Sequence, residues 1–89
     1  MATGSVEQSA AKLLKATITV NEGYGVVENA DITMNTVCMV QILRSDNGWQ
    51  PYIAYPRIIQ AGNIYVYIRD SNGNSPANGS KFDVSIAIK

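Results

Sequence analysis

The strongest constraint on the fold is an alternation of apolar and polar residues with a period of two. In residues 81–89 the apolar positions are Phe82, Val84, Ile86 and Ile88, and polar or small residues separate them. The same alternation recurs in residues 64–69 and 15–20. Successive side chains of a strand point to opposite faces, so each segment has one buried and one solvated face. The pattern therefore predicts an antiparallel β domain.

Length and composition limit the classes of fold and partner. The chain has 89 residues, of which 46% are hydrophobic and 16% charged, which is typical of one globular domain. Seven basic residues balance seven acidic ones, so no net positive field attracts nucleic acid. We therefore expect no nucleic-acid partner.

We also expect no disulfide bond within the chain and no membrane-spanning segment. Cys38 is the one cysteine, which excludes an internal disulfide, and in the apolar run 37–43 it is expected to behave as a small hydrophobic residue. No apolar run approaches the ~20 residues that span a bilayer. No basic segment followed by an apolar core begins the chain, so we expect no secretory signal and no membrane partner.

Residues 1–14 differ in composition from the remainder. Ser5 and Gln8 have the spacing of a capping box, and good helix formers follow them. The predicted helix has only about two turns, which is too short to be stable without a docking surface. A tail that orders only on binding is the second interpretation. We therefore treat residues 1–14 as a short helix or arm and residues 15–89 as the β domain.

The remaining pattern predicts further short strands. Residues 21–29 have the composition of a loop with at most one short pairing segment, and residues 70–80 form the longest polar loop. Pro51 and Pro56 bracket one predicted strand and place it at a sheet edge. The additional strands are expected at residues 30–34, 37–43, 50–55 and 57–60. Seven or eight short strands at this spacing match an all-β sandwich, jelly roll or barrel, and we expect a small antiparallel sandwich with a jelly-roll-like arrangement.

Catalytic and metal-binding patterns are weak. The chain has no histidine, which excludes histidine-based triads, and nearly all of its acids fall in predicted loops or on wet faces. Asp70, Asn72 and Asn74 resemble the start of a calcium loop. Ser75 and Lys81 then stand where glycine and a bidentate glutamate are needed, so a solvated turn is favoured. We expect no enzyme activity, no catalytic residue, no metal and no cofactor.

Three groups of residues are candidates for binding. Tyr65, Tyr67 and Arg69 share one side of a strand, a combination favoured at protein contacts but equally compatible with cross-strand packing. A second apolar strand face and the N-terminal segment add the protein-contact candidates Val37, Met39, Leu43, Leu13 and Leu14. An aromatic cluster near one predicted hairpin could instead stack on a sugar; it consists of Trp49, Tyr52 and Tyr55.

The order of these signals resembles a small β-sandwich module of tailed bacteriophages. The resemblance rests on five features in this order along the chain: a strand at 15–20, a polar strand with an Asn-containing turn at 29–36, the apolar strand 37–43, a glycine turn leading into 64–68, and a closing strand. Such modules occur in head decoration (cement) proteins, head fibres and tail fibres.

The resemblance covers residues 15–89 and brings no catalytic residue. It implies a non-enzymatic virion component, made in the host cytoplasm and often trimeric. The implied partner is the major capsid protein or another virion protein, with residues 1–14 as a capsid-binding arm. A carbohydrate- or receptor-binding fibre tip is the second hypothesis.

Overall fold

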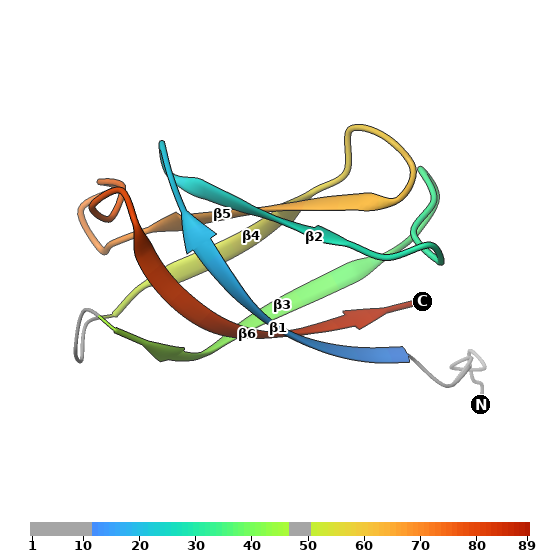
Figure 1. Ribbon diagram of the computed structural model, residues 1–89, viewed down its shortest axis with the longest axis horizontal. Coiled ribbons are helices and arrows are strands. Elements are labelled where there is room, and N and C mark those ends of the chain that lie inside the picture. Colours follow the sequence, from blue (N-terminus) through green and yellow to red (C-terminus); the bar gives the residue numbers. More distant parts are fainter. Residues whose placement is uncertain (1–11, 47–50) are drawn as a thin grey trace, which may run out of the picture.

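The computed structural model describes residues 12–46 and 51–89, which form two antiparallel sheets without a helix (Figure 1). Sheet A has the strand order β1-β6-β3, and sheet B has the order β2-β5-β4. The strands are β1 (Lys12–Val20), β2 (Tyr24–Glu28), β3 (Cys38–Ser45), β4 (Ile53–Arg57), β5 (Asn63–Arg69) and β6 (Ser80–Ile88). The all-β prediction is confirmed, and the two layers are consistent with a small β-sandwich.

The core lies between the inner faces of the two sheets. The central strand of sheet A contributes Phe82, Val84 and Ile86, and the central strand of sheet B contributes Ile64, Val66 and Ile68; all six are fully buried. These are the apolar positions of the period-two segments. Each such side chain contributes about 1.5–3 kcal/mol on full burial, so these two strands carry much of the hydrophobic stabilisation.

Two of the predicted strands are wrong. Residues 30–34 form turns around Ile32, which is buried although it belongs to no strand. Thr36 N–H donates to the Thr33 carbonyl, which closes the turn expected at Asn35 and Thr36 and extends it back to Thr33. Residues 58–60 likewise follow the end of β4 and lead into a turn at Gly62. The described residues therefore contain six strands, not seven or eight.

Strand β2 occupies a segment that the sequence analysis treated mainly as a loop. Its glycine is required by close packing, because a Cβ built on Gly25 would lie 2.9 Å from the Cβ of Ile18 in β1. Glycine within a strand often marks such an approach of another chain segment. Gly25 therefore interrupts the alternation of apolar and polar residues in β2, at the point where β1 and β2 are in contact.

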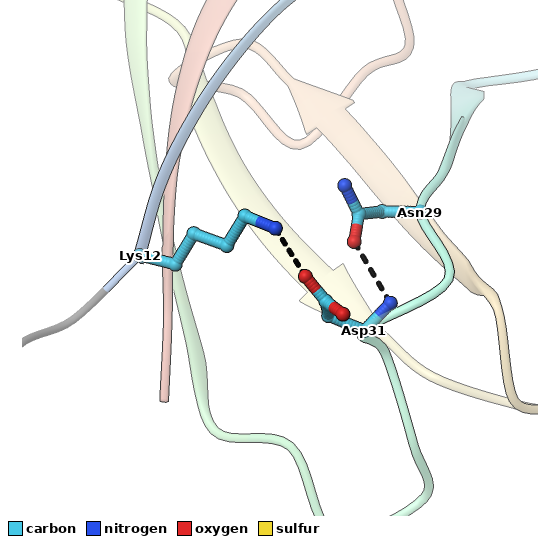
Figure 2. A network of polar contacts seen from close by, with 3 residues as sticks. All are labelled: Lys12, Asn29 and Asp31. Atoms are coloured by element: carbon cyan, nitrogen blue, oxygen red, sulfur yellow. Dashed lines mark hydrogen bonds and ion pairs between the residues drawn. The ribbon is translucent and has the colours of Figure 1, made fainter.

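The N-terminal helix is wrong for the part of it that the structure describes. Lys12, Leu13 and Leu14 pair with β6 and extend β1, while residues 1–11 lie outside the described range. Lys12 forms an ion pair with Asp31 in the loop that follows β2, and Asp31 N–H donates to Asn29 Oδ1 at 2.9 Å (Figure 2). Both ion-pair side chains are more than half exposed, so the contact contributes at most about 1 kcal/mol.

The sequence correctly places a proline-containing strand at an edge. Pro56 lies within β4, which is the outer strand of sheet B, so its missing N–H removes no bond from the centre of the sheet. The sequence Asp46-Asn47-Gly48 predicts a hairpin turn, of which residues 47 and 48 lie outside the described range. Asp46 itself holds the end of β3, because its N–H donates to the Lys81 carbonyl and its Oδ1 accepts from the Lys81 N–H.

Substitution of Gly25 by alanine tests the close packing of β1 against β2. We expect Gly25→Ala to lower the free energy of unfolding by about 1–3 kcal/mol, because the added methyl group overpacks the contact with Ile18. Urea denaturation measures the change. Val26→Ala is the matched control, since Val26 is the next residue and is exposed. Equal stability of Gly25→Ala and the parent chain would contradict this packing.

Candidate interaction surfaces

The outer face of sheet B, here called the tyrosine face, collects aromatic and basic side chains. It includes Tyr24, Val26, Ile53, Tyr55, Arg57, Tyr65, Tyr67 and Arg69, and Glu28 and Asn63 lie at its edge. The strand register places Tyr24, Tyr67 and Tyr55 in one row across β2, β5 and β4. The row arises because each tyrosine occupies a polar-side position of its own strand, opposite the positions that enter the core.

The tyrosine rings contact one another along and across this row. The Tyr55 and Tyr67 rings are almost parallel, at 11°, with centroids 6.2 Å apart. Tyr24 is tilted against both Tyr67 and Tyr65, at centroid distances of 5.3 and 5.5 Å. Such pairs contribute about 0.5–1.5 kcal/mol beyond area burial. The rings therefore form a connected and preorganised surface.

Arg69 is fixed at one end of the tyrosine face. Its Nη1 donates to the carbonyl oxygens of Gly23 at 3.0 Å and Ile68 at 2.8 Å, and the guanidinium lies 5.8 Å from the Tyr67 ring centroid. A Cβ on Gly23 would lie 2.5 Å from Nη1, and the backbone φ of this glycine is +90°. Arg69 therefore joins the β1–β2 turn to β5 while keeping its charge beside the aromatic row.

The outer face of sheet A, here called the basic face, has a different composition. It comprises Leu13, Lys15, Thr17, Val37, Met39, Gln41, Leu43, Arg44, Lys81, Asp83, Ser85, Ala87 and Lys89. Leu13, Ala87 and Met39 lie directly opposite one another across β1, β6 and β3. Leu13 and Met39 are 61% and 73% exposed, so this aliphatic row faces solvent.

A β-bulge shapes the other end of the basic face. The register between β3 and β6 shifts between Ile42 and Arg44, so the extra residue Leu43 remains half exposed. Two shallow hollows of about 270 and 190 Å³ flank this region, and both are lined by Thr17 and Asp83. Thr17 Oγ1 donates to Asp83 at 2.7 Å, and Leu43 lines the larger hollow.

The structure separates the predicted binding residues into these two faces. Tyr65, Tyr67 and Arg69 lie on the tyrosine face, while Leu13, Val37, Met39 and Leu43 lie on the basic face. Leu14 instead points inward and packs against the core.

The proposed sugar-binding cluster is divided. Tyr52 packs edge-on against the core residue Phe82, with ring centroids 5.0 Å apart, whereas Tyr55 belongs to the tyrosine face. Trp49 lies outside the described residues.

Sequence reasoning missed Tyr24, Val26, Ile53 and Arg57 as members of the tyrosine face. Ile53, Tyr55 and Arg57 alternate with Ala54 and Pro56, a period-two signal that the small inner residues concealed.

Four aspartates among the described residues have local structural roles: Asp31, Asp46, Asp70 and Asp83. Asp70 Oδ1 accepts the N–H groups of Asn72 and Asn74, both at 2.9 Å, which is the hydrogen bonding of a tight turn. No group of three or more histidine, cysteine, aspartate or glutamate side chains that could hold a metal ion occurs in residues 12–46 and 51–89. No helix within the same ranges has the length and apolarity required to cross a membrane.

Cys38 faces inward at the start of β3. Its side chain packs against the core, and this burial raises the pKa of the thiol. The thiolate is the nucleophilic form, so a raised pKa lowers the reactive fraction near neutral pH. The geometry of Cys38 is therefore that of a packed thiol.

Comparison with known proteins gives no assignment. No protein family, no curated protein and no solved structure matches the chain.

The raised pKa of Cys38 predicts the pH dependence of its alkylation. In the folded chain the rate should rise at higher pH than in the chain unfolded in urea, because burial disfavours the thiolate. Iodoacetamide labelling followed by mass spectrometry measures both profiles. A folded-state midpoint at or below that of the unfolded chain would contradict burial as the controlling effect.

Proposed function

We propose that this chain is a non-enzymatic structural component of a bacteriophage particle, with capsid decoration as the most specific form of the proposal. Its partner in that role is the major capsid protein or another virion protein, and its location is the virion. The chain acts by covering protein surfaces and does not transform a substrate. The phage assignment rests on the sequence resemblance, and the binding mode rests on the surfaces described above.

One observation carries the proposal of a contact role: both outer sheet faces expose large apolar side chains. Met39 on the basic face is 73% exposed and Ile53 on the tyrosine face is 56% exposed. Small soluble domains rarely leave contiguous apolar surface uncovered unless it contacts a partner. A cement protein joins neighbours, and a domain with one contact surface on each sheet is suited to that task.

The strand order supports a jelly-roll-like domain. The first strand pairs with the last, and the second pairs with the second-to-last, in separate sheets. This inward wrapping is the plan of jelly rolls, which occur in capsid and lectin domains. The order is compatible with both the decoration hypothesis and the fibre-tip hypothesis. A trimer is the favoured assembly, with heterologous contacts between copies.

Decoration would act through mass action. A protein that binds the assembled lattice and not its separated subunits shifts the equilibrium toward the lattice. The chain needs no reacting group for this effect. It needs only a surface that is complementary to the assembled lattice.

Three substitutions of exposed residues test the contact role. Met39→Ser and Ile53→Ser should each weaken co-sedimentation with phage heads about tenfold, because removal of a central apolar contact costs on the order of 1–2 kcal/mol. Ile59→Ser is the matched control, since Ile59 is 49% exposed but lies in the loop after β4. An equal loss of head binding in all three variants would refute the proposal. Failure of the parent chain to co-sediment with phage heads would also refute it.

The fibre-tip hypothesis keeps one supporting observation, the nearly parallel rings of Tyr55 and Tyr67. Glycan-array binding that is lost in Trp49→Ala but retained in Tyr65→Ala would favour it over decoration. Absence of glycan binding by the parent chain would exclude it.

The arm hypothesis has its own test. The test is a deletion of residues 2–11, which ends before β1 begins at Lys12. We expect the shortened chain to keep its β-sheet circular dichroism and to lose binding to heads. Unimpaired binding would refute the arm.

A further inference from the structure

We propose that a hollow beside the turn between β1 and β2 binds a neutral saccharide, with the Glu22 carboxylate as the acceptor for its hydroxyl groups. The turn comprises residues 21–24 and leads from sheet A to sheet B (Figure 1). The inference goes beyond the proposed contact role and does not depend on it. It also uses none of the residues of the sugar-binding cluster predicted from the sequence.

The hollow has the size and the lining of a small-molecule site. Its volume is about 370 Å³, compared with about 270 and 190 Å³ for the two hollows beside Asp83. Sites for small ligands have volumes of about 300–1,000 Å³. A hydroxyl, two amides, a carboxylate and an aromatic ring line it, and they belong to Thr19, Asn21, Asn78, Glu22 and Tyr24. A sugar requires this combination, because its hydroxyl groups need donors and acceptors while its C–H face packs on a ring.

Hydrogen bonds hold the polar groups of the hollow in place. Asn21 N–H donates to the Tyr24 carbonyl at 3.0 Å, and Tyr24 N–H donates to the Asn21 carbonyl at 3.3 Å. Glu22 N–H donates to Asn78 Oδ1 at 2.8 Å. This bond fixes the Asn78 amide and leaves its Nδ2 group to donate to a ligand. Groups that are already fixed lose less conformational entropy when a ligand binds.

The ring of Tyr24 is also fixed before a ligand binds. It contacts the rings of Tyr67 and Tyr65, at centroid distances of 5.3 and 5.5 Å. Tyr24 therefore belongs both to the hollow and to the tyrosine face, and it offers an aromatic surface at the boundary between them.

The conformation of Glu22 is the observation that carries the inference. Its φ is +56°, and it is the only non-glycine residue with a positive φ in residues 12–46 and 51–89. Gly23 follows with a φ of +90°, which is the pattern of a type I′ turn. The first central position of such a turn favours asparagine or glycine, so glutamate is a poor choice for the turn itself.

The side chain of Glu22 does not repay this strain within the fold. The carboxylate is exposed, and it has no hydrogen bond or ion pair with another residue that the structure describes. Residues held in sparsely populated backbone conformations cluster at binding sites. We therefore assign the Glu22 carboxylate to the ligand of the hollow.

The charges around the hollow favour a neutral ligand. Glu22 would repel a ligand that carries a carboxylate or phosphate group. A cationic ligand is disfavoured by Arg69, whose guanidinium lies against the same turn and whose Nη1 donates to the Gly23 carbonyl at 3.0 Å. Tyr24 is also the only aromatic residue among those that line the hollow, so there is no aromatic cage for a quaternary ammonium group.

The test uses the full-length chain and an array of neutral oligosaccharides, each printed beside a sialylated counterpart. We expect binding to at least one neutral glycan and weaker binding to its sialylated counterpart. Titration of the ¹⁵N-labelled chain with the best-bound neutral glycan should shift the NMR signals of residues 19–26 and of Asn78.

The substitution Glu22→Asn separates binding from folding. Asparagine adopts a positive φ more readily than glutamate, so the variant should unfold at a higher urea concentration than the parent chain. It should bind the same glycan at least about tenfold more weakly, because a hydrogen bond to a charged acceptor is lost. A side chain with a merely structural role would not lower binding while raising stability.

Glu28→Asn is the matched control. Glu28 is the other glutamate of the described residues and is also exposed, but it lies at the end of β2 and does not line the hollow. Its substitution should leave glycan binding unchanged and should not raise the stability.

The possible results separate this inference from the other proposals. Absence of binding to every neutral glycan, preference for sialylated glycans, or equal binding by Glu22→Asn and Glu28→Asn would overturn the inference. Loss of glycan binding in Trp49→Ala, with binding intact in Glu22→Asn, would overturn it in favour of the fibre-tip cluster. Failure of the parent chain to bind phage heads, with glycan binding lost only in Glu22→Asn, would overturn the phage assignment and leave this inference standing.

Discussion

The packing of β5 against β6 is the interaction on which the remainder of the structure depends. Each strand is central in its sheet, so its backbone is paired on both sides and its inner side chains are covered by the opposite sheet. The edge strands attach to this pair and complete the core from either side. With the inner faces occupied in this way, any partner of the sheets must approach the outer faces or the edges.

The same packing explains why the outer faces have become specialised. The strongly apolar inner positions already supply the core, so the outer positions are not required to be apolar. They nevertheless carry a row of tyrosines on sheet B and a row of aliphatic residues on sheet A. A domain of this size buries only a little over 60% of its unfolded surface. Covering one outer face with a partner would therefore add a substantial fraction to its apolar burial.

The sequence predicted the segments in which alternation is uninterrupted. Strands β1, β5 and β6 were recognised because most of their inner positions are large and apolar, and β4 was placed at an edge by its proline. Strand β2 was obscured by Gly25, whose small size is required by contact with Ile18. The turn around Ile32 was mistaken for a strand because one apolar residue between polar neighbours resembles the apolar–polar alternation of a short strand.

The candidate surfaces were only partly predictable for a related reason. Alternation within one strand shows which residues share a side, as it did for Tyr65 and Tyr67. Cross-strand register decides which strands contribute neighbours, and it brought Tyr24 and Tyr55 to the same row. Register depends on long-range pairing, which the sequence of one strand does not specify. The bulge at Leu43 and the hollows beside it were hidden for the same reason.

Methionine oxidation tests the central claim most directly, because the chain supplies its own control. Met39 on the basic face and Met34 in the loop before β3 are 73% and 59% exposed. Dilute peroxide should oxidise both at similar rates in the isolated chain. On phage heads, mass spectrometry should show Met39 protected while Met34 remains reactive, as expected if a neighbour covers the sheet. Equal oxidation of the two methionines on the particle would contradict the account.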